Sequence, residues 1–276
     1  MSRVWLITGA NSGFGRAIAT AAVATGDVVV AAARRTGTLD DLVAAHPDQV
    51  EAVQLDVTDI AAAEAAVADV VARHGRIDVL VNNAGRTHVG AAEETTDAEL
   101  RALFDVHFFG PAALTRAALP HMRARRGGAI VQLSSMGGQM SFAGFGAYSA
   151  TKFALEGLSE ALADEVNRLG VKVLIVEPGA FRTGLMDSKQ FSEAISDYDE
   201  SVGNTRRMTQ EVNGSQPGDP DKAAAAILAA LDAEKTPLRL VLGGDAVDAV
   251  VGHLESVRAD VEAWEKVSRA TAFDQA

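Results

Sequence analysis

The chain has 276 residues, of which 48% are hydrophobic and 22% charged, values typical of a globular protein rather than a disordered or fibrous one. Its formal net charge of −12 opposes binding to nucleic acid or to an anionic membrane, because both attract a positive protein surface. The absence of cysteine excludes disulfides and thiolate metal ligands, and no metal site is expected.

The amino-terminal residues 1–3 lead directly into an apolar segment, so we expect no cleavable secretion signal. No apolar run reaches the roughly 18 residues that a membrane-spanning helix requires. A chain without cysteine also fits a reducing compartment. These features predict a cytoplasmic protein.

Short apolar segments alternate with longer segments of helical character along the chain. The expected strands are 4–8, 28–33, 52–56, 79–82, 129–134, 171–177 and 238–242. The expected helices are 13–25, 39–45, 60–74, 97–125, 148–169 and 220–234. This alternation predicts an α/β fold of the Rossmann-like type, a doubly wound parallel seven-stranded sheet with helices on both faces, in a single domain over residues 1–276.

Two segments stand outside the alternation. Residues 184–218 are polar and contain Gly and Ser, which indicates a lid over a substrate site. Residues 245–270 form an expected carboxyl-terminal helix with one apolar face. That face comprises Val247, Val250, Val251, Leu254, Val257, Val261 and Trp264. It requires a covering surface, either on its own domain or on a second subunit.

A glycine-rich segment follows the first expected strand and opens the first expected helix. It reads Thr8-Gly9-Ala10-Asn11-Ser12-Gly13-Phe14-Gly15. The free N–H groups at a helix start attract a pyrophosphate, and glycine lets a phosphate approach the backbone closely. A plain tight turn is the alternative, but the position between a strand and a helix favours a dinucleotide site.

The ends of the next strands carry candidate cofactor contacts. Arg34 and Arg35 follow the second strand, where folds that prefer NAD carry an acid against the ribose 2′-hydroxyl. Guanidinium groups suit a 2′-phosphate, so we expect NADP(H) in preference to NAD(H), with solvated surface arginines as the alternative. Asp56 closes the third strand and either accepts a hydrogen bond from adenine or caps the helix near residue 59. Residues 82–85, Asn-Asn-Ala-Gly, close the fourth strand and form either a ligand contact or a simple turn.

The trio Ser135, Tyr148 and Lys152 is the most informative group. Tyr148 and Lys152 are four residues apart, which places both on one helix face, where the ammonium favours the phenolate. A free tyrosine has a pKa of about 10, so we expect Lys152 and an oxidised nicotinamide to lower that pKa toward the range of acid–base catalysis. Ser135 is then placed to hold the substrate oxygen. For Tyr148 and Lys152 alone, a chance pairing on a surface helix is the alternative.

With these segments in this order, the chain resembles the short-chain dehydrogenase/reductase family, in its NADP-preferring branch. The resemblance covers roughly residues 3–243 and also rests on Pro178-Gly179 followed by Thr183. It implies that Tyr148 is the catalytic acid/base, that Ser135 binds the substrate oxygen, and that Lys152 modulates the tyrosine and binds the nicotinamide ribose. It further implies a cofactor groove lined by Gly9, Asn11, Ser12, Gly13, Phe14, Gly15, Arg34, Arg35, Asp56, Val57, Asn83, Ala84, Gly85, Tyr148, Lys152, Pro178, Gly179, Phe181 and Thr183.

His107 departs from the family pattern, because it occupies the place of an active-site Asn that supports a proton-relaying water. An imidazole can hydrogen-bond such a water or transfer the proton itself, so a working relay is the leading interpretation and His107 is taken as a catalytic residue. A neutral structural substitute and an impaired site remain as alternatives.

Apolar residues near the strand ends and in the lid predict a lipophilic substrate. They are Met136, Met140, Phe142, Phe145, Phe181, Leu185, Met186 and Phe191. Small-ligand sites are commonly apolar with few polar groups, although each of these residues alone fits ordinary core packing equally well.

The resulting hypothesis is an NADP(H)-dependent oxidoreductase that interconverts a lipophilic ketone or aldehyde and its alcohol. The alternatives are a regulator of the same fold that senses NADP with little turnover, and an isomerase or dehydratase, which the loop spacing disfavours. Because members of the family are usually dimers or tetramers, the resemblance also implies a homo-oligomer.

Overall fold

The computed structural model describes residues 2–185, 190–212 and 214–273. Its centre is a seven-stranded parallel sheet in the order β3-β2-β1-β4-β6-β7-β9. The strands are β1 (Val4–Thr8), β2 (Val28–Ala33), β3 (Val50–Gln54), β4 (Val79–Asn82), β6 (Gly128–Leu133), β7 (Val171–Pro178) and β9 (Arg239–Leu242). The chain builds outward from β1 to β3, returns to the centre at β4 and builds toward β9, which confirms the predicted doubly wound Rossmann-like fold.

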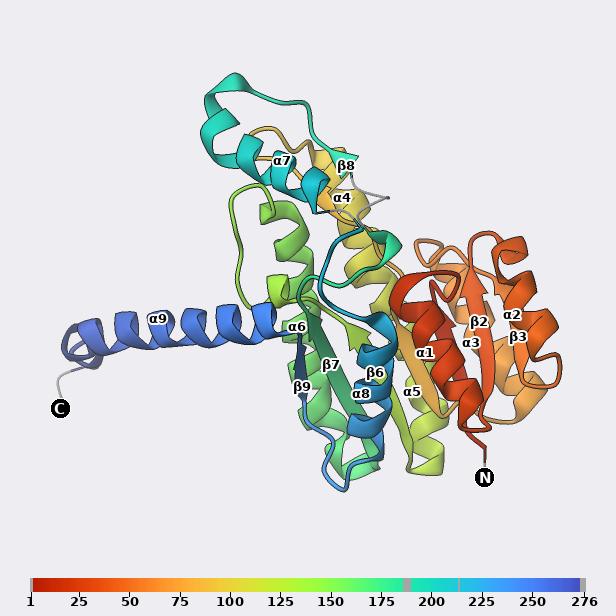
Figure 1. The fold of residues 1–276 in the computed structure, drawn as a ribbon. Coiled ribbons are helices and arrows are strands. Elements are labelled where there is room, and N and C mark those ends of the chain that lie inside the picture. The colour runs from red at the N-terminus through yellow and green to blue at the C-terminus, as the bar shows by residue number, and fades with distance from the viewer. Residues whose placement is uncertain (1, 186–189, 213, 274–276) are drawn as a thin grey trace.

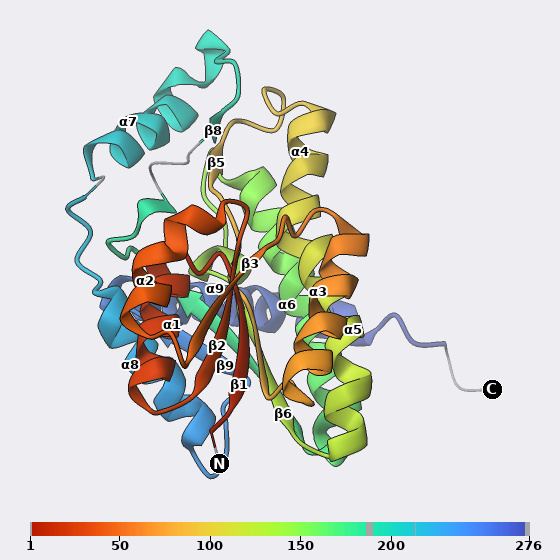
Figure 2. The same cartoon turned by 90° about the vertical axis from the view of Figure 1, so that its right-hand side faces the viewer.

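Helices cover both faces of this sheet (Figure 2). On one face, α1 (Gly13–Ala24), α2 (Asp40–Ala45) and α8 (Pro220–Asp232) bury a core that includes Ile18, Leu42 and Ile227. On the other face, α3 (Ile60–His74), α5 (Gly110–Arg125) and α6 (Gly146–Val166) bury Val67 and Leu114. Both faces of each central strand are therefore dry, which explains why the strands read as continuous apolar runs.

The expected helix 97–125 is interrupted, and this is the largest difference from the sequence prediction. It consists of α4 (Asp97–Phe104), a π-helical turn (Asp105–Phe109) and α5. A Cβ on Gly110 would lie 2.5 Å from the carbonyl oxygen of Val57, so the helix packs closely against the loop after β3 at this point. Pro111 follows and has no N–H to continue the α-helical ladder. Turns of this kind inside helices often occur at functional sites.

Other differences are smaller. The third strand is Val50–Gln54, two residues earlier than predicted, and the predicted helix 39–45 begins with a 3₁₀ turn (Thr36–Leu39). Two short strands, β5 (His88–Val89) and β8 (Gln190–Phe191), pair in parallel and were not predicted. The expected lid contains β8 and α7 (Asn204–Glu211), which lie above the carboxyl ends of the strands with α4 (Figure 1).

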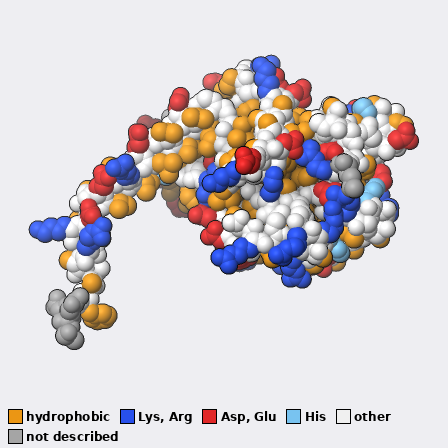
Figure 3. Space-filling view, turned by 90° about the horizontal axis from the view of Figure 1, so that it is seen from below, with side chains coloured by type: hydrophobic (Ala, Val, Ile, Leu, Met, Phe, Trp, Pro, Cys, Tyr) orange, Lys and Arg blue, Asp and Glu red, His pale blue; other side chains and the backbone are white. Residues whose placement is uncertain are grey.

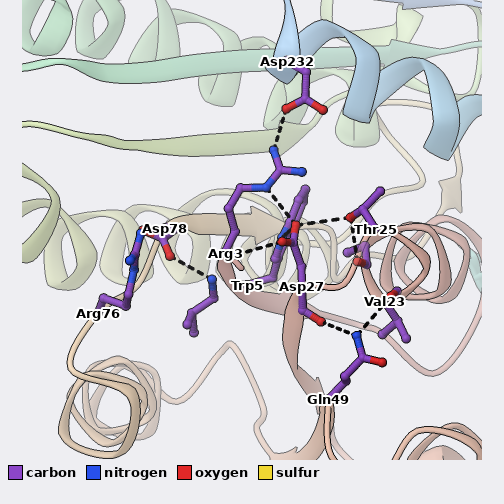
Figure 4. A network of polar contacts seen from close by, with 11 residues as sticks. Arg3, Trp5, Val23, Thr25, Asp27, Gln49, Arg76, Asp78 and Asp232 are labelled. Carbon is purple, nitrogen blue, oxygen red and sulfur yellow. Dashed lines mark hydrogen bonds and ion pairs between the residues drawn. The ribbon is translucent and has the colours of Figure 1, made fainter. Parts of the chain in front are cut away.

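Buried carboxylates join the amino ends of the strands, at the edge opposite the lid (Figure 4). Asp27 accepts hydrogen bonds from the side chains of Arg3 and Trp5, each at 2.8 Å. Asp78 accepts from the backbone N–H of Val4 at 2.8 Å and from Arg76 at 2.6 Å. These contacts tie the segments that precede β1, β2 and β4 to one another.

The carboxyl-terminal helix α9 (Gly244–Arg269) begins directly after β9 and projects away from the sheet as an arm (Figure 1). It matches the predicted helix 245–270 to within one residue at each end. No helix among the described residues is long and apolar enough to cross a membrane.

Candidate active site

A cleft of about 610 Å³ lies at the carboxyl ends of the strands, as expected for an open α/β sheet. Most predicted cofactor and catalytic residues line it: Gly9, Asn11, Ser12, Gly13, Phe14, Arg34, Asp56, Val57, Asn83, Ala84, Gly85, His107, Ser135, Tyr148, Lys152, Pro178, Gly179, Phe181 and Thr183. The cleft therefore runs from the end of β2, across the glycine loop, to the start of α6.

The glycine loop is held in shape by its own packing. Gly13 has a φ of +51°, in the left-handed region that favours glycine. A Cβ on Gly15 would collide with the carbonyl oxygen of Gly9 and the side-chain amide of Asn83. That amide donates to the carbonyl oxygens of Thr8 at 2.8 Å and Gly9 at 3.2 Å. Gly15 does not line the cleft, so it is required for close packing inside the loop rather than for approach of a phosphate.

At the end of β2, the two predicted arginines differ in position. Arg34 lines the main cleft, whereas Arg35 lines only a shallow depression that it shares with Arg34. Asp56 accepts hydrogen bonds from the backbone N–H of Thr58 at 3.0 Å and from its hydroxyl at 2.8 Å. These bonds and the nearby charge of Arg34 lower the pKa of Asp56. Asp56 is not the cap of α3, because Asp59 takes that role by accepting from a backbone N–H at 3.0 Å.

Tyr148 lies in the first turn of α6 and is 9% exposed. Burial raises the pKa of its phenol to about 12, and a hydrogen bond with Ser135 opposes this shift. The protein's own groups therefore keep the phenol protonated, opposite to the direction expected from Lys152. The Lys152 Nζ lies 5.8 Å from the centroid of the Tyr148 ring, and the charge of Lys152 is not among the causes that shift the pKa of the phenol.

Lys152 is almost completely buried. Its Nζ donates to the carbonyl oxygen of Leu133 at 2.7 Å, at the end of β6. Burial lowers the pKa of Lys152 to about 8, and the negative charge of Glu156 one helical turn later opposes this shift. Lys152 therefore titrates closer to neutral pH than an ordinary lysine.

His107 is 1% exposed, and both of its ring nitrogens have partners. Nε2 accepts the backbone N–H of Arg86 at 3.1 Å. Nδ1 lies 2.9 Å from the Thr151 hydroxyl, which donates its own hydrogen to the Tyr148 carbonyl oxygen at 2.7 Å, so Nδ1 must be the donor. Burial, with the charges of Lys152 and Arg86, lowers the pKa of His107. These contacts fix a neutral imidazole between α6 and the loop after β4.

A pair of buried carboxyl groups behind Lys152 was not found by sequence analysis. Glu156 of α6 and Glu177 of β7 are 4% and 0% exposed. The Gln139 amide donates to Glu177 Oε1 at 2.9 Å, and Arg239 Nε lies 3.1 Å from Glu156 Oε2 and 3.4 Å from Glu177 Oε1. Burial raises the pKa of both, and for Glu177 the charge of Glu156 adds to give a pKa of about 7. One signal was available in the sequence, an acid inside the apolar strand 171–177.

Asp245, at the start of α9, was also missed. Its carboxylate accepts the backbone N–H of Ala180 at 2.7 Å, and a Cβ on Gly179 would collide with it. Gly179 and Ala180 line the cleft, so the root of α9 anchors one wall of the site. An acid shortly after the last strand gives no sequence signal for this contact.

The predicted substrate residues are only partly brought together. Phe181 and Leu185 line the cleft, and Phe181 packs against Phe14 with ring centroids 5.1 Å apart. Five others do not line it: Met136, Met140, Phe142, Phe145 and Phe191. Phe145 and Phe191 instead pack in a small core with Val89 beneath the lid, and Phe142 is 41% exposed. Met186 lies outside the described residues. Val212 and Gln216 from the lid line the cleft and were not predicted.

The residues present fit a nicotinamide dinucleotide. The observation that carries this fit is one continuous cleft, with the open start of α1 along its length, Arg34 at one end, and the buried Lys152 and Tyr148 at the other. No cluster of His, Cys, Asp and Glu that would hold a metal ion occurs in the part of the chain that the structure describes. Fold and cleft together define a nicotinamide-dependent oxidoreductase.

Comparison with known proteins identifies the family. The chain matches the family model for the short chain dehydrogenase over residues 3–194. It is 36% identical over 274 residues to oxidoreductase BOA17 of Botryotinia fuckeliana, covering 99% of this chain and 100% of the relative. It is 37% identical over 246 residues to the 3-ketodihydrosphingosine reductase of Bacteroides thetaiotaomicron, covering 87% and 88% of the two chains.

Solved structures agree. A short-chain dehydrogenase from Streptomyces avermitilis is 65% identical with a TM-score of 0.94, covering 99% of this chain and 100% of its own. A metagenomic short-chain oxidoreductase in complex with NADP is 31% identical with a TM-score of 0.69, covering 88% and 97%. The chain belongs to the short-chain dehydrogenase/reductase family, whose members are NAD(P)-dependent enzymes acting on CH–OH or carbonyl groups.

Proposed function

We propose that the protein, acting as one domain, is an NADP(H)-dependent reductase of lipophilic ketones or aldehydes, with Tyr148 as the proton donor. The observation that carries the proposal is the buried Tyr148 phenol in the same cleft as Ser135 and Lys152. When bound, the nicotinamide supplies the hydride.

The protein's own groups handle the proton and the substrate oxygen. A phenol with a pKa of about 12 is fully protonated at neutral pH, which suits a donor to the carbonyl oxygen during reduction. Ser135 holds the same oxygen through its hydroxyl. Lys152, with a pKa of about 8, binds the nicotinamide ribose and stabilises the tyrosinate left after proton transfer.

The preference for NADP(H) rests on Arg34. Its guanidinium lines the cleft at the end of β2, where an NAD-preferring site would carry an acid. Arg34→Ala is expected to raise the Kd for NADPH at least tenfold and that for NADH less than threefold, because only NADPH carries the 2′-phosphate. Fluorescence titration of both cofactors measures this, with Arg35→Ala as the control of equal charge change and smaller effect. Equal losses for both cofactors would contradict the assignment.

His107 is proposed to position the site in its neutral form. Because both ring nitrogens are engaged, His107→Asn is expected to keep kcat within roughly tenfold and to leave the pH profile unchanged near pH 6–7. His107→Phe leaves the Arg86 N–H without its acceptor and the Thr151 hydroxyl oxygen without its donor, and is expected to reduce stability by about 1–3 kcal/mol. Urea unfolding and pH–rate profiles test these outcomes. A hundredfold fall in kcat for a fully stable His107→Asn would instead support proton relay through the imidazole.

The lipophilic substrate class is supported by the apolar side chains that Phe181, Leu185 and Val212 bring to the cleft. The name of one relative, a 3-ketodihydrosphingosine reductase, agrees with a lipid-like ketone. The test is a panel of aryl, alicyclic and long-chain ketones and aldehydes, with sugars as hydroxylated controls, each with NADPH and NADH. We expect kcat/KM at least tenfold higher for the lipophilic carbonyls. No NADPH consumption with any of them would overturn the proposed function.

A further inference from the structure

The arm formed by α9 presents an apolar face that its own domain does not cover (Figure 3). Leu254 is 53% exposed, and Val261 and Trp264 are each 65% exposed. In the first two turns, Ala246 and Val250 are buried and anchor the helix to the domain. The exposed apolar residues of the helix are Val247, Val251, Leu254, Val257, Val261, Trp264 and Val267.

The spacing of these residues is that of a helix which packs against another helix. Leu254, Val257, Val261 and Trp264 follow each other at steps of three and four residues. Val247 lies seven residues before Leu254, so the stripe keeps a heptad repeat along the arm. A helix of 26 residues is about 39 Å long, and isolated helices depend on packing of an apolar face for most of their stability.

The charges of the arm disfavour a membrane as the partner. Helices that lie on anionic membranes carry Lys and Arg on the polar face. Here six acidic residues outnumber three basic ones, which are Arg258, Lys266 and Arg269. The protein as a whole also has a net charge of −12. A protein partner with a matching apolar helix is therefore favoured.

We propose that the partner is a second copy of this chain, and that the two α9 helices pair antiparallel about a twofold axis near residues 255 and 256. This alignment places Leu254 against the partner's Val257 and Val247 against the partner's Trp264. Large and small apolar side chains then face each other, so the same stripe is self-complementary, as a twofold interface requires.

The charges beside the stripe select this alignment. In the antiparallel pair, His253 faces the partner's Asp260 and Arg258 faces the partner's Val251, so no like charges oppose each other beside the stripe. A parallel pair would place Asp260 against the partner's Glu265 and both domains at the same end. The antiparallel pair places the domains at opposite ends of the arms.

The first test is the association state of the full chain by light scattering and sedimentation. Leu254→Asp/Val261→Asp removes two exposed side chains of the stripe and is expected to raise the dimer dissociation constant at least a hundredfold. Ala259→Asp, on the opposite side of the same helix, adds a like charge and is expected to associate as wild type does. A wild-type protein that is monomeric at tens of micromolar, or a double variant that associates as tightly as wild type, would overturn the proposal.

The second test determines the alignment of the two helices by disulfide cross-linking. Because the chain contains no cysteine, only the introduced cysteines can cross-link. Val247→Cys and Trp264→Cys proteins, when mixed and oxidised, are expected to cross-link with each other. Neither variant should cross-link with itself. In the antiparallel pair the two copies of residue 247 are 17 residues apart along the helix axis, which is about 26 Å, whereas a disulfide requires Cα atoms within about 7 Å of each other. Efficient cross-linking of Val247→Cys alone would indicate parallel pairing. Cosedimentation of monomeric wild type with anionic vesicles would indicate a membrane partner. Either result would overturn the proposal.

Discussion

Tyr148→Phe is expected to lower kcat/KM for carbonyl reduction by roughly 10³-fold, because it removes the only proposed proton donor to the substrate oxygen. The ring itself should stay in place. It packs edge-on against His107 and Phe145, with centroids 5.4 and 6.2 Å away, and neither contact involves the hydroxyl. The loss should therefore appear in turnover, with the unfolding transition and the Kd for NADPH nearly unchanged.

The chain offers a matched control for this substitution, since it contains only two tyrosines. Tyr198 lies in the lid, and its hydroxyl donates to Glu93 at 2.7 Å on the surface. Tyr198→Phe removes the same atom from an exposed hydrogen bond and should keep kcat/KM within about threefold of wild type. If Tyr148→Phe kept more than a tenth of the wild-type activity, Tyr148 would not be the proton donor.

The sheet was predictable because both of its faces are buried. Four of the seven main strands, beginning at Val4, Val28, Val79 and Val171, start where the apolar runs of the sequence start. The strand at 50–54 was predicted two residues too late, because the apolar run of the sequence extends to Leu55 and Asp56 follows it as the polar residue expected to end the strand. In the structure Asp56 already belongs to the following loop, where its carboxylate accepts the backbone N–H of Thr58. A local hydrogen bond between side chain and backbone determines where this strand ends, and the hydrophobic periodicity of the sequence does not reveal such a bond.

The candidate site was predictable where the chemically active residues lie at characteristic spacings along the sequence. The glycine loop, Tyr148 and Lys152 have fixed spacings along the chain, and the structure brings them into one cleft. The residues on the substrate side could not be predicted, because tertiary packing decides whether an aromatic residue near a strand end faces the cleft or the core. Phe145, for example, packs into the small core with Val89. The engagement of both His107 nitrogens likewise depends on Arg86 and Thr151, which lie 21 and 44 residues away.

Glu177→Gln is expected to change how stability depends on pH, because Glu177 is a fully buried carboxyl with a pKa of about 7 in the folded protein. In the unfolded chain a glutamate has a pKa of about 4.3, so folding raises it. The stabilisation that comes from the protonated form is then fully present below about pH 4.3 and is lost as the pH rises through 7. Gln cannot ionise and avoids this loss.

We therefore expect Glu177→Gln to resemble wild type at pH 5 and to be more stable than wild type at pH 8, by about 1–3 kcal/mol. Urea unfolding across this range measures the difference. Glu160→Gln is the control, because Glu160 contacts the same Arg239 at 2.8 Å but its side chain is 61% exposed. It should leave the pH dependence of wild type in place. A Glu177→Gln protein that loses stability between pH 5 and 8 as steeply as wild type would show that Glu177 does not take up the proton. The buried proton would then belong to Glu156, which faces the same Gln139 and Arg239.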